Sequence, residues 1–149
     1  MAIARGAGTE IIRSILLEEV DNNGSILIFG VAHHIYTVLS VICYADVVAT
    51  AGNYIRMRIV GYDAKEGTTG NNQYLFLHNM QPSQTFVWDT KFSFNGNEPV
   101  NFTGPMDSIV KQDAIADQGQ ATAQKLEINS EAATDNFIVT CTYIDQNNA

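Results

Sequence analysis

The chain has 149 residues, with 8 Lys and Arg against 16 Asp and Glu, which gives a formal net charge of −8. This length suits one domain around one hydrophobic core. A pI near 4.6 and the lack of any stripe of Lys and Arg argue against a nucleic-acid partner, because nothing would displace the counterions of the phosphates. Charged residues make up only 16% of the chain, and Asn, Gln, Thr and Ser take their place.

The start of the chain shows no charged segment followed by a long apolar run, as a signal peptide would have. Polar residues interrupt every apolar stretch before it reaches the length of about 18 residues that a membrane span needs. We therefore expect no signal peptide, no membrane partner and synthesis in a cytoplasm. Residues 1–9 are small and polar for the most part, and we expect them to form an extended N-terminal arm.

Period-2 alternation dominates the rest of the chain. Residues 10–20 could be read as an amphipathic helix, but residues 21–24 (Asp-Asn-Asn-Gly) are a turn signal, and residues 25–31 are short, β-branched and apolar. We therefore predict a β-hairpin here.

Residues 35–47 are apolar on both faces, which is typical of a central strand that is covered on both sides. Strict alternation assigns Ile35, Leu39, Val41 and Cys43 to one face and Tyr36, Val38, Ile42 and Tyr44 to the other. In residues 54–62, Ile55, Met57 and Ile59 alternate with Arg56 and Arg58, which predicts a half-exposed strand with both arginines outward.

Shorter elements follow. Residues 65–72 form a loop by composition, 74–78 a strand, 81–84 a turn, and 85–88 and 91–94 two short strands. Asn95-Gly96 is a strong signal for a type I′ hairpin turn, and 99–102 would return as an edge strand that begins at a proline.

Residues 103–123 lack a clear strand pattern, and we expect one long loop there with a short helical turn. The loop either covers the edge of its own domain or contacts a neighbouring subunit. Alternation resumes over 124–129, with Leu126 and Ile128 inward, and over 136–145. The sequence therefore predicts an all-β fold, a single-domain antiparallel β-sandwich or jelly roll of about 8–10 short strands spanning residues 10–149.

Four segments together carry a resemblance to a known class of protein. They are the small residues leading into Glu10–Arg13, the strand His34–Leu39, the stretch Gln84–Gly96 and the ending Asp135–Gln146. In this pattern the chain resembles small β-sandwich virion structural proteins of tailed bacteriophages, the capsid cement, decoration and neck-associated proteins. The resemblance implies a structural role in a virion without catalysis. The implied partners are the major capsid protein or other virion proteins, with a homo-oligomer on the particle.

No pattern of catalytic or ligand-binding residues competes with this interpretation. Cys43 and Cys141 lie in apolar strands and are expected to be buried thiols. The adjacent His33 and His34 would point to opposite faces of a strand, so the pair cannot chelate one metal. His78 would have to join with carboxylates, and their spacing gives no hint of a site. We expect no catalytic residue, no cofactor and no metal. The aromatic residues Tyr74, Phe76, Phe86, Trp88, Phe92 and Phe94 could form a sugar-stacking platform but are more typical of a sandwich core.

The leading hypothesis is therefore a non-enzymatic structural protein of a phage virion that binds and stabilises the assembled shell. The alternative is a receptor-binding, carbohydrate-binding, neck or tail accessory module. The candidate contact residues come from the arm, from the strand with two arginines and from the long loop: Ile3, Arg5, Arg56, Arg58, Met106, Ile109, Val110 and Ile115.

Overall fold

The computed structural model describes residues 9–63, 68–97, 108–110 and 123–147. The regular elements of these residues are β1 (Thr9–Val20), β2 (Ser25–Phe29), β3 (His34–Val47), β4 (Tyr54–Asp63), β5 (Thr68–Asn79), β6 (Thr85–Trp88), β7 (Phe92–Asn95), β8 (Lys125–Ser130) and β9 (Asn136–Asn147). The strands over 10–20, 35–47, 54–62, 74–78, 85–88, 91–94, 124–129 and 136–145 are confirmed, with shifts of a few residues at their ends.

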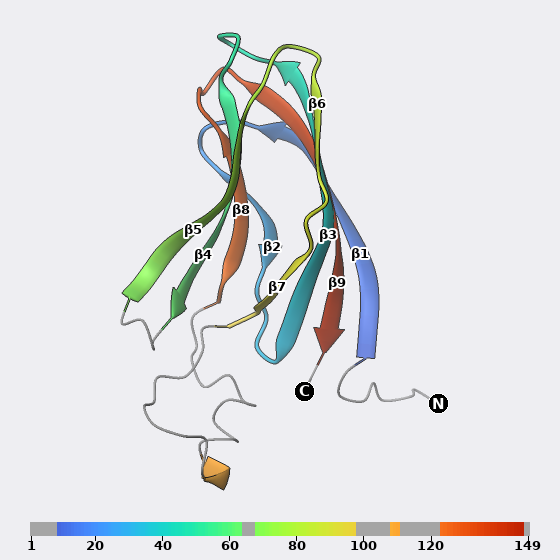
Figure 1. Cartoon of the computed structure of the whole chain (residues 1–149), viewed down its shortest axis with the longest axis vertical. Coiled ribbons are helices and arrows are strands. Elements are labelled where there is room, and N and C mark those ends of the chain that lie inside the picture. Colours follow the sequence, from blue (N-terminus) through green and yellow to red (C-terminus); the bar gives the residue numbers. More distant parts are fainter. Residues whose placement is uncertain (1–8, 64–67, 98–107, 111–122, 148–149) are drawn as a thin grey trace.

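The strands form two antiparallel sheets that pack face to face (Figure 1). Sheet A has the order β1-β9-β3-β6, with β7 also paired to β3, and sheet B has the order β2-β8-β4-β5. The first strand pairs with the last, β2 with β8, β3 with β6 and β7, and β4 with β5. This nested pairing is the topology of a jelly roll, so the predicted all-β sandwich is confirmed.

The first two strands do not form the predicted hairpin. The turn after β1 is present, with the Asn23 N–H donating to Asp21 Oδ1 at 2.8 Å and Gly24 at a φ of 81°. However, β1 pairs with β9 in sheet A and β2 pairs with β8 in sheet B. The turn therefore carries the chain from sheet A to sheet B. In this arrangement the inward apolar residues of β1 and β2 are covered by the facing sheet.

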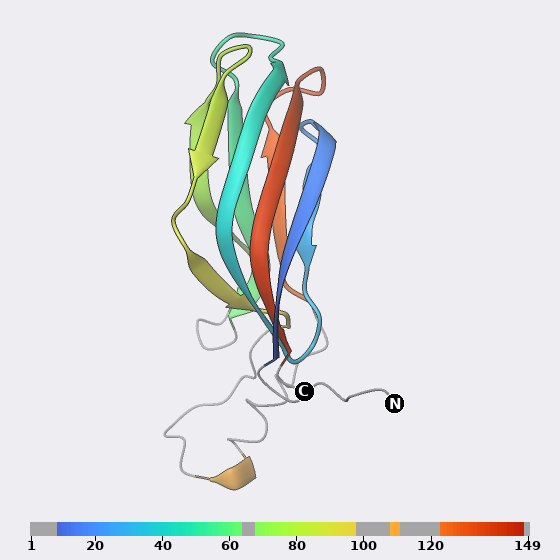
Figure 2. The same ribbon diagram turned by 90° about the vertical axis from the view of Figure 1, so that its right-hand side faces the viewer.

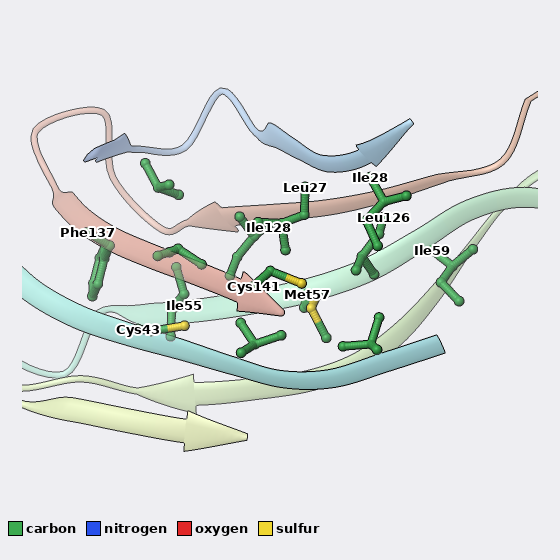
Figure 3. Close-up of a cluster of buried hydrophobic side chains, with 14 of the residues drawn as sticks. Leu27, Ile28, Cys43, Ile55, Met57, Ile59, Leu126, Ile128, Phe137 and Cys141 are labelled. Carbon is green, nitrogen blue, oxygen red and sulfur yellow. The ribbon is translucent and has the colours of Figure 1, made fainter. Parts of the chain in front are cut away.

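The core lies between the two sheets (Figure 3). Its largest fully buried side chains include Phe137, Ile55, Met57, Leu126 and Ile128, from β9, β4 and β8. The predicted inward faces of β4, β8 and β9 are therefore confirmed. Cys43 and Cys141 are free, buried thiols as predicted, and burial raises the pKa of each to about 12.

The inward face of β3 differs from strict alternation because the strand contains a β-bulge. The register with β9 shifts between Val38 and Ser40, which places Leu39 in the bulge. The bulge changes the phase of the strand, so the inward residues are Tyr36, Val38, Val41, Cys43 and Ala45. The strand is central in sheet A as predicted, but its outer face is exposed and not covered.

The Asn95-Gly96 dipeptide does not form the predicted type I′ turn. Gly96 lacks the positive φ that such a turn requires, and its N–H donates to the His34 carbonyl at 2.8 Å. A Cβ atom on Gly96 would lie 1.8 Å from the Val31 carbonyl oxygen. The glycine is therefore needed for a close approach of two backbone segments.

The remaining predicted segments have different outcomes. Residues 68–72 belong to β5 and not to a loop, and Thr9 already belongs to β1. Residues 1–8, the predicted strand over 99–102 and most of the predicted loop over 103–123 lie outside the described residues.

A buried carboxylate joins two turns at one end of the sandwich. Asp135, which is 4% exposed, accepts hydrogen bonds from the Ala49 N–H at 2.8 Å, the Ala132 N–H at 2.9 Å and Asn53 Nδ2 at 3.2 Å. Burial alone would raise the pKa of this carboxyl, but these hydrogen bonds outweigh burial and lower the pKa below its ordinary value. Asp135 therefore ties the β3–β4 turn to the β8–β9 turn in its ionised form.

We expect Asp135→Ala to lower the free energy of unfolding by about 3 kcal/mol, since two buried N–H groups lose their acceptor. Because the folded-state pKa is depressed, the contribution is complete above the ordinary pKa of about 3.9 and is lost as the pH falls through the folded-state value. Urea unfolding of both proteins at neutral and acidic pH measures this difference. The exposed Asp89 offers the control Asp89→Ala, which should change little; an equal loss in both variants would contradict this role for Asp135.

Candidate functional site

The middle of the outer surface of sheet A consists of uncharged side chains in four rows that run across the strands, and Glu10 of β1 lies one row beyond Ile12. Figure 2 shows this sheet from its outer side, with β1, β9, β3 and β6 side by side. The registers give the rows Ile12–Ile144–Thr37–Ser93, Ser14–Thr142–Ser40, Leu16–Thr140–Ile42–Val87 and Ile138–Tyr44–Thr85. We call these residues the A surface.

The third row of the A surface presents large apolar side chains to solvent. Leu16 is 54% exposed, Ile42 41% and Val87 55%, although they come from β1, β3 and β6. Ile12 in the first row is 67% exposed. A contiguous exposed apolar surface of this kind marks an interaction site more often than isolated apolar residues do.

Four of the eight hydroxyl groups of the A surface bond to one another in pairs. Ser14 and Thr142 are joined at 3.2 Å, and Thr37 and Ser93 at 2.8 Å. Because these groups already have partners, covering them with another protein costs less than covering free hydroxyls would. Burying these four hydroxyl groups therefore requires no hydrogen bond from outside.

The outer surface of sheet B carries charge. Arg58 on β4 donates from Nη2 and Nε to Glu127 Oε2 on β8, at 3.0 and 3.2 Å. Both side chains are largely buried, with 23% and 20% of their surface exposed. Burial works against the charge of Arg58, but the hydrogen bonds to Glu127 and Tyr74 outweigh it and raise the pKa of Arg58 above its ordinary value.

Arg56 lies beside Arg58 on the same face, as the spacing of the two residues predicted. Its Nε donates to Asn129 Oδ1 at 3.0 Å, and its guanidinium carbon is 5.1 Å from the centre of the Tyr54 ring and 5.1 Å from that of the Tyr74 ring. The two arginines are thus held by side chains of their own sheet. Their predicted contact with an acidic neighbour stays a prediction.

A polar cluster at the other end of β9 resembles a catalytic arrangement but holds the strands together. Asp145, which is 6% exposed, accepts hydrogen bonds from Arg13 Nε at 3.0 Å and from His34 Nδ1 at 2.5 Å. Burial, followed by the charge of Asp145, raises the pKa of the neighbouring Tyr36 to about 12. The carboxylate joins β1 and β3 to β9.

Among the described residues, no three His, Cys, Asp or Glu side chains are arranged to hold a metal ion. His34 contacts Asp145, and the ring of His78 stacks on Phe86 with centroids 4.2 Å apart. No helix within these residues is long and apolar enough to cross a membrane.

Only four of the eight predicted contact residues, Arg56, Arg58, Ile109 and Val110, belong to the described residues. Ile3, Arg5, Met106 and Ile115 lie outside the described residues, while Ile109 and Val110 are 74% and 78% exposed. Of the six aromatic residues, five are buried or packed against the core as expected, and Tyr74 is exposed. Sequence reasoning missed the A surface. The available signals were two strands, residues 10–20 and 35–47, with apolar residues at both alternating positions.

Comparisons with known proteins give the fold some context. No model of a protein family matches the chain, and no curated protein does. Among solved structures, the chain is similar to a protein of Bacillus endospore appendages, which are described as disulfide-linked pili. The match covers 100% of this chain and 97% of that chain, with 13% identity and a TM-score of 0.43. A similarity of this degree does not assign a function.

The two neighbouring arginines should differ in their effect on stability. Arg58→Gln leaves the Glu127 carboxylate largely buried without its partner, so we expect a loss of about 1 kcal/mol. Arg56→Gln leaves no carboxylate unpaired and should cost less. Thermal unfolding of the two matched variants makes the comparison. A larger loss for Arg56→Gln would contradict the assignment of partners.

Proposed function

We propose that the protein is a non-enzymatic structural protein that associates with copies of itself through the A surface. The observation that carries the proposal is the row Leu16–Thr140–Ile42–Val87, which crosses four strands with three large exposed apolar side chains. Covering these side chains with the same surface of a second copy removes apolar area from water.

The size and charge of the A surface fit such a contact. Each of the fourteen residues of the A surface covers about 4.8 Å across the strands and about 6.6 Å along them, which gives roughly 450 Å² per copy. Two copies would bury about 900 Å², which is the size of a weak or transient interface. Because the chain has a net charge of −8, an uncharged surface is the place where copies repel each other least.

We further propose that the assembly is a phage virion, with this protein acting as a capsid cement or decoration protein made in the host cytoplasm. Support for this finer assignment comes from the residue pattern shared with small β-sandwich virion proteins. The major capsid protein would then be the second partner of the oligomer. A role at the neck or tail is the alternative.

A matched set of variants tests the contact. Leu16→Lys and Val87→Lys place a charge in the A surface, whereas Leu77→Lys places one at an equally exposed position on β5 of sheet B. We expect the first two variants to raise the dissociation constant of self-association, measured by sedimentation, at least tenfold. Leu77→Lys should behave as the unchanged protein. Added salt should strengthen association of the unchanged protein, because it screens the net negative charge.

The proposed contact would be overturned if the unchanged protein were a monomer at every concentration, or if all three variants lost self-association equally. The same variants test the virion assignment. Quantitative mass spectrometry of phage particles that encode the protein gives the number of copies per particle. Tens to hundreds of copies of the unchanged protein per particle, and fewer of Leu16→Lys, would support a cement role. A handful of copies would favour the neck or tail, and none would exclude the virion.

A further inference from the structure

Arg56 is a charged group for which sheet B provides no opposite charge. Along β4, Arg58 stands opposite Glu127 of β8 and is paired with it, while Arg56 stands opposite the neutral Asn129. Within the part of the chain that the structure describes, no side chain accepts a hydrogen bond from the Nη atoms of Arg56. A half-buried guanidinium of this kind has hydrogen-bond donors left for a partner from outside.

The guanidinium group is held in one orientation by three side chains. Asn129, which is 6% exposed, accepts from Arg56 Nε at 3.0 Å and donates from its own Nδ2 to the Ser130 carbonyl at 3.2 Å. The rings of Tyr54 and Tyr74 each lie 5.1 Å from the guanidinium carbon. Since Nε is already used, the Nη1–Nη2 end of the fork is the part that can receive a carboxylate with two hydrogen bonds.

A shallow hollow of about 370 Å³ adjoins this fork. It is lined by Arg56 and by Tyr74, Leu75, Phe76 and Leu77 of β5. The side chains of Tyr74 and Leu77 are 54% and 56% exposed, so they offer an apolar surface next to a fixed cation. This volume is at the lower end of the range of small-molecule sites.

We propose that this hollow binds the carboxylate of an acidic sugar residue, of the hexuronic acid type, with the carboxylate on Arg56 and the apolar face of the sugar ring against Tyr74 and Leu77. This glycan site is independent of the A surface and lies on the opposite sheet. An aromatic ring beside a polar fork suits a sugar, because sugar rings present C–H groups on one face and hydroxyl groups at their edge.

The hollow fits a sugar better than an acidic peptide. A peptide that binds by adding a strand to the free edge of β5 would meet an irregular strand, because the register between β4 and β5 shifts at this point, between Met57 and Arg58. Such a bulge interrupts the regular spacing of backbone groups that strand addition requires. A compact ring with one carboxylate requires no such edge.

The local charge also favours an anionic ligand. The outward residues of β4 and β8 include Arg56, Arg58 and Lys125, three of the eight Lys and Arg residues in the chain, and the carboxylate of Glu127, while Glu131, just after β8, accepts from the Tyr54 N–H. An otherwise acidic protein therefore has a cationic region at this surface, and the pairing of Arg58 with Glu127 leaves Arg56 as the group that attracts a carboxylate.

The test is a titration of the full chain with D-glucuronate, followed by NMR signals of the Arg56 Nε–H group and the Leu77 methyl groups. We expect saturable shifts of both, with a dissociation constant in the millimolar range that is usual for a single sugar unit. D-glucose lacks the carboxylate and acetate lacks the ring, so each should bind at least tenfold more weakly. An Ile12 methyl signal on the A surface should not move.

Two variants on the same sheet face make the result specific. Arg56→Gln should abolish the shifts, whereas Lys125→Gln removes a cation two rows away and should retain at least half of the affinity. Leu16→Lys on the A surface should bind glucuronate unchanged, which separates this site from the self-association. Three outcomes would each overturn the sugar assignment. The first is an equal loss of binding in Arg56→Gln and Lys125→Gln, and the second is equal binding of acetate and glucuronate. The third is Arg56-dependent binding of an acidic dipeptide but not of glucuronate.

Discussion

The ladder between β3 and β9 is the constraint on which the other layers of the sandwich depend. It pairs residues 34–47 with residues 136–147, in the middle of sheet A, so that β1 can add to one side and β6 and β7 to the other. The register shift at Leu39 keeps both Tyr36 before it and Val41 and Cys43 after it inward, in a strand that is apolar on both faces. The same ladder sets which side chains remain outside.

The outer side chains of this ladder form the centre of the A surface. Thr140 stands opposite Ile42, and the pairing continues to Leu16 on one flank and to Val87 on the other. An apolar row on the outer face is thus a consequence of the same register that fills the core. The outer face of sheet B differs, since Glu127 and Asn129 bring hydrogen-bonding groups opposite Arg58 and Arg56. The two proposed partners differ accordingly: an uncharged protein surface for sheet A and a carboxylate for sheet B.

Strand positions were predictable from the sequence because alternation of period 2 depends on neighbouring residues alone. The pairing was not, since a turn such as Asp21–Gly24 has the same composition whether it joins two strands of one sheet or crosses between sheets. Gly96 was misassigned for a related reason: it is required by a contact with Val31, which lies far away in the sequence.

The candidate sites show the same limit. The spacing of Arg56 and Arg58 correctly placed both on one outward face, but Asn129 and Glu127 lie 73 and 69 positions further along the chain. Which arginine receives a carboxylate depends on the register between β4 and β8, and this register is invisible in the sequence. The A surface was missed because each of its strands contributes only a few of its residues.

The central claim is that the A surface is the contact surface, and methyl NMR over a dilution series tests it most directly. The A surface contributes the methyl groups of Ile12, Leu16, Ile42 and Val87, and sheet B contributes those of Ile26 and Leu77. The account predicts that signals of the first set shift or broaden as the protein concentration rises, while those of the second set stay unchanged. Changes confined to Ile26 and Leu77, or no change in either set, would contradict it.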